Sequence, residues 1–329
     1  MKRISLVLAL LTLGTVSTAR GDQLGDNMAD AARRFLGSLD DQGGAQARFA
    51  FDSPERFNWH WIPRERKGLP IKSLKGDQRA LAFGLLDTGL STKGAIKATT
   101  IMSLEEILRI DEHGTGPIRD PELYFVSVFG DPGPTGEWAW RIEGHHLALN
   151  FTLKDGKVIS GTPFMFGSNP AKVLEGPRKG LRNLAEISDP AYELLHSLTE
   201  SQLKQAVVAD VAPEVTTTPN AKRPQDSTPE GIAFDKLNAA QQQTLKQLLL
   251  VYAINFPDPV RDILHDQAEA NDQSLHLAWY GSTDTSKNHS FRIQGATVLV
   301  DFNNTQNGTN HIHTFYRSYV NDFGIPAPK

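Results

Sequence analysis

The sequence predicts an α+β fold made of two related halves, each an antiparallel β-meander covered by helices on one face. Two observations carry this prediction. The spacing of apolar residues changes twice from a period of 3.6 to a period of 2, which is typical of helices packed on a sheet. In addition, the second half of the chain repeats short motifs of the first half in the same order.

In the first half, apolar residues at helical spacing predict helices over residues 22–35, 73–90 and 101–110. Between the first two helices lies an aromatic and basic stretch, residues 56–66. Residues 124–150 then alternate with a period of 2, which predicts strands.

After these strands, residues 170–208 are again expected to be helical, with breaks at Gly176-Pro177 and Asp189-Pro190. Residues 213–231 are rich in Thr, Pro and Asn without periodicity, which predicts a linker or long surface loop. Helices are expected over residues 234–250 and 258–265, and strands over residues 275–319.

The repeated motifs predict an internal duplication. Trp140–Gly144 resembles Phe291–Gly295, and Leu147–Phe151 resembles Val298–Phe302 at the same offset along the chain. Each copy then reaches a hairpin-turn signal, Asp-Gly in the first and Asn-Gly in the second. Chance similarity between two strands is the alternative.

These boundaries predict four segments, of which the first is a signal peptide, residues 1–19. It has two basic residues, then an apolar run too short to span a membrane comfortably, then small residues. We therefore expect a secreted or periplasmic protein without a membrane span after signal removal. The N-terminal half (22–212), the linker (213–231) and the C-terminal half (232–329) follow, together forming one composite domain.

Composition excludes several classes of protein. A net charge of −4 and a pI near 6.2 provide no basic surface for nucleic acid. The absence of Cys excludes thiolate nucleophiles, disulfides and Cys-ligated metal. Motifs of serine hydrolases, P-loop proteins, His-Glu-x-x-His metalloproteases and dinucleotide-binding proteins are also absent.

Four histidines form a candidate metal site between the two halves. His311 and His313 stand two apart, so on one strand they share a face and can bind one ion. His145 and His146 are adjacent, so on a strand only one of them joins that face. Nitrogen and oxygen ligands suit zinc or copper. Alternatively, the histidines form a buried polar network.

The residues that lie opposite these histidines depend on the length of the turn before them. A two-residue turn at 307–308 pairs His313 with Phe302. A three-residue turn with a bulge instead brings Asp301 and Asn303 onto the histidine face. In that register Asp301 is a candidate third metal ligand or orienting residue.

Three further residues are candidates for catalysis. Glu143 is a candidate general base, and His60 can join the site from the aromatic stretch. Arg141 can bind an anionic substrate, although its counterpart Arg292 in the second copy also suggests a structural role.

Two motifs, Glu143–Asn150 and Asp301–Arg317, resemble the uncharacterised family called domain of unknown function 3500. Trp59–Pro63 and Asn321–Gly324 are similar to it as well, and the resemblance extends from about Phe49 to Gly324. It implies that the four histidines lie within family motifs. It implies no activity.

The sequence thus favours a secreted, metal-dependent enzyme that uses zinc or copper, with hydrolysis as the expected reaction. A non-catalytic extracytoplasmic protein that binds a sugar or other small ligand in an aromatic cleft is the alternative, and a copper oxidase or copper carrier is a third possibility. The aromatic residues of that cleft would be Trp59, Trp61, Trp138 and Trp140. Substrate and oligomeric state are not predicted.

Overall fold

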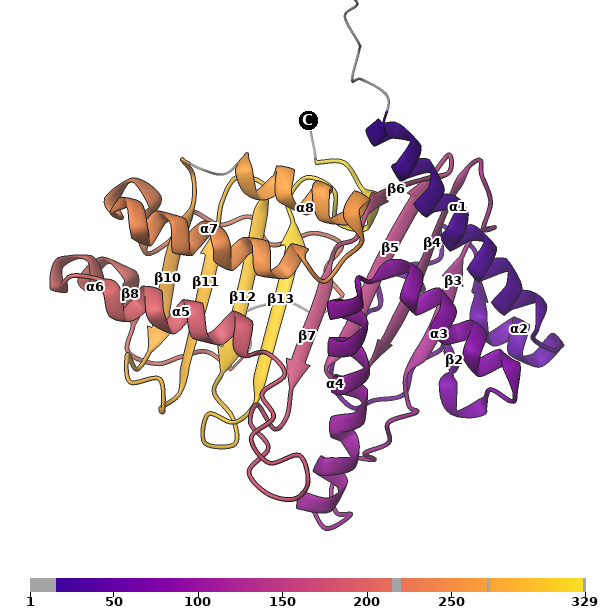
Figure 1. Ribbon diagram of the computed structural model, residues 1–329, viewed down its shortest axis with the longest axis horizontal. Helices are drawn as coiled ribbons and strands as arrows, with labels where there is room; N and C mark the ends of the chain where they lie inside the picture. Colours follow the sequence, from indigo (N-terminus) through magenta and orange to yellow (C-terminus); the bar gives the residue numbers. More distant parts are fainter. Residues whose placement is uncertain (1–15, 215–219, 271–272, 328–329) are drawn as a thin grey trace, which may run out of the picture.

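The computed structural model describes residues 16–214, 220–270 and 273–327 (Figure 1). The predicted signal peptide lies mostly outside these residues. Helix α1 (Val16–Gly37) contains the predicted helix 22–35. No helix in the described part of the chain is long and apolar enough to cross a membrane.

One sheet of thirteen strands forms the centre of the molecule (Figure 1). Its strands are β1 (Arg48–Phe49), β2 (Leu69–Pro70), β3 (Phe125–Phe129), β4 (Glu137–Gly144), β5 (Leu147–Lys154), β6 (Lys157–Ser160), β7 (Phe164–Ser168), β8 (Val207–Ala209), β9 (Ile232–Ala233), β10 (His276–Gly281), β11 (His289–Gln294), β12 (Val298–Asn304) and β13 (Ile312–Ser318).

The strand order is β1-β3-β4-β5-β7-β13-β12-β11-β10-β8, with β2, β6 and β9 attached to β3, β5 and β10. The ladders between the longer strands are antiparallel, while β1 pairs with β3 and β8 with β10 in parallel. The two predicted strand blocks therefore form one continuous sheet, joined where β7 pairs with β13.

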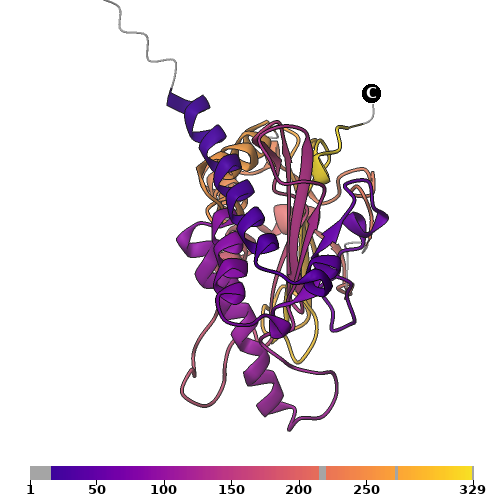
Figure 2. The same ribbon diagram turned by 90° about the vertical axis from the view of Figure 1, so that its right-hand side faces the viewer.

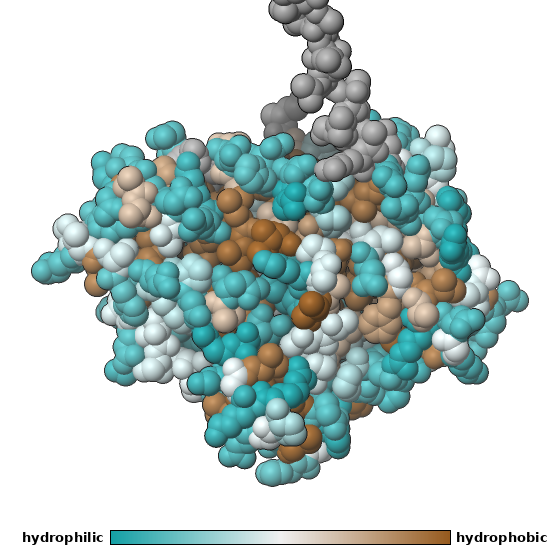
Figure 3. All heavy atoms as spheres, in the orientation of Figure 1, coloured by the Kyte–Doolittle hydropathy of each residue, from teal (hydrophilic) through white to brown (hydrophobic). Residues whose placement is uncertain are grey.

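The long helices cover one face of this sheet (Figure 2). Figure 3 shows this face, where polar residues predominate and hydrophobic residues are exposed between the helices. Besides α1, the helices are α2 (Asp41–Ala47), α3 (Asp77–Gly89), α4 (Thr92–Asp111), α5 (Ala185–Ser197), α6 (Glu200–Ala206), α7 (Ala239–Ala253) and α8 (Asp258–Glu269), with short 3₁₀ turns at Pro54–Phe57, Ile71–Ser73, Phe234–Lys236 and Asp322–Gly324.

Two helices differ from the sequence prediction. Helix α4 begins nine residues before the predicted residue 101, because Ser91 caps it by accepting a hydrogen bond from the Gly94 N–H at 3.2 Å. In the helical segment expected over 170–208, the first helix, α5, begins only at Ala185, and the expected break at Asp189-Pro190 is absent because Pro190 lies inside α5. Before it, Gly176 and Gly180 adopt positive φ values of 74° and 93°, which an α-helix does not accommodate.

Two crossing segments pack on the opposite face of the sheet. Residues 50–68 bring Trp61 against Phe315 of β13, with ring centroids 4.6 Å apart. The described residues of the predicted linker also contact this face, since the Ser290 hydroxyl donates to the Pro213 carbonyl at 3.2 Å.

The hairpin between β12 and β13 settles the register that the sequence left open. Asn303 pairs with His313, and Asp301 pairs with Phe315, so the histidine face carries Asp301 and Asn303. The connection is longer than either expected turn. It comprises residues 305–311, since Asn304 pairs with Ile312, and residues 307–309 within it all have positive φ.

Candidate metal centre

The candidate site lies at one edge of the sheet, where the β4–β5 turn meets the end of β7 and the start of β13. The expected continuous strand through residues 145–146 is wrong. β4 ends at Gly144, and His145 and His146 form the two-residue turn, with His146 at a φ of +58°. In a turn both imidazoles can project toward the same region, unlike adjacent residues on a strand.

Backbone contacts fix this turn. The His146 N–H donates to the Trp61 carbonyl at 2.8 Å, and the His146 carbonyl accepts from the Gly167 N–H at 2.8 Å. A side chain at Gly144 would collide with Tyr124, because a Cβ there would lie 2.3 Å from its ring. The crossing segment and β7 therefore hold the turn from both sides.

Three imidazoles converge at this edge. The Nε2 atom of His146 lies 2.8 Å from Nε2 of His311 and 3.1 Å from Nε2 of His313. Tetrahedral zinc with bonds of about 2.0–2.1 Å requires ligand nitrogens about 3.3 Å apart. Because His146 Nε2 has at most one hydrogen, it cannot donate to both neighbours. The three ring nitrogens form a group that could hold a metal ion.

Burial keeps these imidazoles neutral. It lowers the pKa of His146 and His313 well below the ordinary value, and it lowers the pKa of His311 to about 4, with smaller contributions from His145 and Arg119. Neutral imidazole is the form that binds metal. The three imidazoles are therefore in the form that can bind a metal ion at neutral pH.

The model of the family described as protein of unknown function (DUF3500) matches residues 22–325. The chain belongs to this family. All four candidate histidines lie inside the DUF3500 region. No curated protein and no solved structure matches this chain.

In this DUF3500 protein a second group of side chains surrounds His145, next to the three imidazoles. The His145 ring lies 3.7 Å from the His146 ring, measured between centroids. Glu105 of α4 contacts His145 Nδ1 at 2.5 Å, and Arg119 Nη1 lies 3.2 Å from the same nitrogen. Glu105, His145 and His146 form a second group of possible ligands. The positive charge of Arg119 disfavours a cation there, so the trio of His146, His311 and His313 is the better metal site.

The buried pair of Glu105 and His145 can share a proton. Burial raises the pKa of Glu105 to about 8. Burial, and then the charge of Arg119, lowers the pKa of His145 to about 3. Both shifts favour the proton on the Glu105 carboxyl over the proton on His145.

The sequence analysis missed Glu105 and Arg119. Glu105 had a detectable signal, because it falls in phase with Ile101 and Leu108 on the apolar side of a predicted helix. An acidic residue on a buried helical face is rarely without a partner. Arg119 stands in a loop without periodicity, so no comparable signal marks it.

The structure places the other predicted residues in ion pairs on the face opposite the long helices. Glu143 lies 2.9 Å from Arg141, which also contacts Glu55 at 3.0 Å. The His60 backbone N–H donates to Glu143 at 2.9 Å. Glu143 and His60 are outside the groups of possible metal ligands found among the described residues.

Asp301 shares the histidine face but has a partner of its own. Its carboxylate lies 2.8 Å from Arg292, its neighbour across the β11–β12 ladder. Asp301 is likewise outside the groups of possible metal ligands among the described residues.

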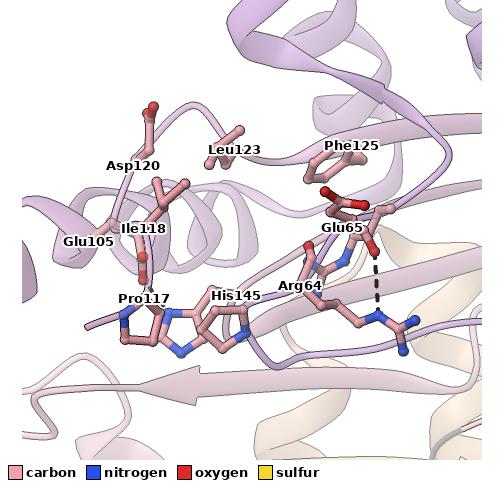
Figure 4. Close-up of a pocket in the computed structure, with 11 residues that line it drawn as sticks. Arg64, Glu65, Glu105, Pro117, Ile118, Asp120, Leu123, Phe125 and His145 are labelled. Atoms are coloured by element: carbon pink, nitrogen blue, oxygen red, sulfur yellow. Dashed lines mark hydrogen bonds and ion pairs between the residues drawn. The ribbon is translucent and has the colours of Figure 1, made fainter.

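A pocket of about 430 Å³ opens beside the pair of Glu105 and His145 (Figure 4). Its apolar walls include Pro117, Leu123 and Phe125, and both members of the pair line it. The four tryptophans of the expected aromatic cleft do not line it. Their exposed fractions are at most 2%, and Trp59, Trp61, Trp138 and Trp140 are all core residues.

Proposed function

We propose that this protein is a metal-dependent hydrolase that holds a zinc or copper ion with His146, His311 and His313. The observation that carries the proposal is the convergence of three Nε2 atoms, with separations from His146 of 2.8 and 3.1 Å. Three protein nitrogens with a fourth position open are the ligand set of catalytic zinc sites. A zinc ion in such a site lowers the pKa of its bound water to about 7 and polarises a carbonyl group.

In this proposal the protein supplies proton transfer and a recess beside the pair of Glu105 and His145. The proton shared by Glu105 and His145 Nδ1 borders the pocket, so a group bound there can receive or return it. The stacked His145 ring also limits movement of the His146 ring. Arg141, Glu143 and His60 hold the crossing segment in place rather than contact the substrate.

Elemental analysis of the mature protein, purified without a His tag or chelator, tests the metal site. We expect about one equivalent of zinc or copper in the wild type and none in the His311→Ala, His313→Ala double variant. His196→Ala is the control, because His196 is an exposed histidine of α5 outside the groups of possible metal ligands among the described residues. A wild type that stays metal-free after incubation with both ions would contradict the proposal, and copper in place of zinc would redirect it to an oxidase.

We also propose that the two halves arose by internal duplication. The supporting observation is the shared register of the two strand blocks. Arg141 pairs with Asn150, and Arg292 pairs with Asp301, at the same offset that relates the motifs. Each block is also flanked by a parallel edge strand, β1 or β8, and by a short antiparallel strand, β2 or β9.

Export remains our proposal for localisation. It rests on the basic, apolar and small-residue order of residues 1–19. Mass spectrometry of the protein from the periplasm or medium tests it, and we expect the mature chain to begin at Arg20. Full-length protein confined to the cytoplasm would contradict export.

A further inference from the structure

The charges around the three imidazoles do not balance once a metal ion is present. The ligands are neutral, and the Arg119 guanidinium lies 3.2 Å from Nδ1 and 3.4 Å from Nε2 of the adjacent His145. Two carboxyl groups contact Arg119 or His145, those of Glu112 and Glu105. Asp120 lines the same pocket, but its charge is balanced by Lys72. Even with both ionised, a divalent ion and Arg119 together carry one more positive charge than the carboxylates compensate.

Both carboxyl groups are already engaged. Glu112 accepts hydrogen bonds from Arg119 Nε and Nη2 at 2.8 and 2.7 Å, and Glu105 contacts His145 at 2.5 Å. An excess charge in a largely buried site is costly unless an ion of opposite charge compensates it. The metal-loaded site therefore favours an additional anion.

Arg119 has the donors to bind such an anion. A guanidinium has five N–H groups, of which Glu112 accepts two. The Nη1 atom faces the imidazole of His145 rather than a carboxylate. The Arg119 side chain is only 9% exposed, so water screens its charge weakly.

We propose that the metal-loaded site binds an oxyanion, namely a carboxylate or phosphate group of the substrate, with Arg119 as its positively charged partner. The forked donors of arginine match the paired oxygens of both groups. This inference rests on the proposed function, because the bound metal ion creates the excess charge. The substrates of the proposed enzyme would therefore carry a carboxylate or phosphate group.

Anion binding to the cobalt-loaded full-length chain tests the inference. The d–d absorption bands of Co²⁺ would be followed while acetate or inorganic phosphate is added, with acetamide as the neutral control. The variants are Arg119→Gln, Arg119→Lys and the control Arg109→Gln. Arg109 is matched because it also pairs with a glutamate, Glu106, at 2.6 Å, but lies on the exposed side of α4.

We expect both anions to shift the bands of the wild type and of Arg109→Gln, and acetamide to leave them unchanged. Arg119→Gln should weaken anion binding by about 10- to 100-fold, the loss of one charge-assisted contact. Its affinity for Co²⁺ should stay equal or rise, because a positive charge is removed. Arg119→Lys, which keeps the charge without the fork, should bind anions with intermediate affinity.

Unchanged anion affinity in Arg119→Gln would overturn the inference, and so would an equal response to acetamide. If circular dichroism shows that Arg119→Gln does not fold, the anion titration of Arg119→Lys tests the inference instead. An anion affinity of Arg119→Lys equal to that of the wild type would then overturn it. Absence of Co²⁺ bands in the wild type is a separate result. It would reject the proposed metal site itself.

Discussion

At Gly167 the absence of a side chain decides where the His146 ring lies. A Cβ at this position would lie 2.8 Å from His146 Cδ2 and 2.9 Å from Met165 Cε. Gly167 also pairs with His313 across the β7–β13 ladder. One glycine therefore allows an imidazole from the first half to approach the two imidazoles of the second half.

Gly167→Ala should displace the His146 ring and lower the metal affinity by about 10-fold or more, as loss of ligand support does elsewhere. Isothermal titration with Zn²⁺ measures this. Gly84→Ala is the control, since nothing lies within 4 Å of a Cβ at that position of α3. That control should keep its metal affinity and gain about 0.5–1 kcal/mol of stability. Equal zinc affinity in both variants would reject the role of Gly167.

His60 makes the stability of the fold depend on pH. Burial, and then the charges of Arg64, Arg66 and Arg141, lowers its pKa to about 4, below the ordinary 6.5 of the unfolded chain. The unfolded state therefore binds the proton more readily than the folded state. The contribution of His60 to stability is complete above pH 6.5 and is lost as the pH falls toward 4.

Urea unfolding of metal-free protein at several pH values between 7.5 and 4.5 measures this dependence. The free energy of unfolding should fall with pH in the wild type, and less steeply in His60→Gln, which cannot take up the proton. Parallel curves for the two proteins would show that His60 does not contribute.

At the scale of elements, a buried ion-pair network joins β4 to the 3₁₀ turn Pro54–Phe57. Arg141 donates to the Glu55 carbonyl at 2.9 Å and contacts the Glu143 carboxylate at 2.9 Å. Arg66 lies 3.6 Å from the same carboxylate. The network fixes the segment that carries Trp61, whose carbonyl accepts the His146 N–H.

Glu143→Ala should lower the free energy of unfolding by about 3–5 kcal/mol, because it leaves two buried guanidinium groups without their carboxylate. Glu200→Ala is the control, since Glu200 pairs with Lys204 at 2.7 Å on the exposed surface. That change should cost no more than about 0.5 kcal/mol. If Glu143→Ala instead abolishes hydrolysis and leaves stability intact, the original prediction of Glu143 as general base is favoured.

For the whole molecule, the proposed ion would connect the two halves. His146 comes from the first strand block, while His311 and His313 come from the second, and the blocks meet where β7 pairs with β13. A ligand that binds the folded state stabilises it in proportion to its affinity. Metal binding should therefore stabilise the fold as a unit.

Zinc at 100 times its dissociation constant should raise the free energy of unfolding by about 2.7 kcal/mol. His146→Ala and His313→Ala should each abolish this gain, although they lie in different halves. His196→Ala, at an exposed histidine outside the groups of possible metal ligands among the described residues, should retain it. Persistence of the gain in either site variant, measured by chemical unfolding with and without zinc, would place the ion elsewhere.

The sequence by itself determined the helices and strands with strong periodicity, because hydrophobic spacing reflects the local geometry of each element. It also identified the four histidines. It did not predict that His145 and His146 form a turn, because the backbone hydrogen bonds that hold this turn come from Trp61 and Gly167, which lie far from it along the chain.

Only the tertiary structure decided which side chains meet. The register of β13 depends on the long turn at residues 305–311, and a shift of one residue would move His313 to the opposite face. Glu105 and Arg119 reach His145 through the packing of a helix and a loop against the sheet edge. Such contacts depend on the relative positions of segments far apart in the chain, which no local pattern encodes.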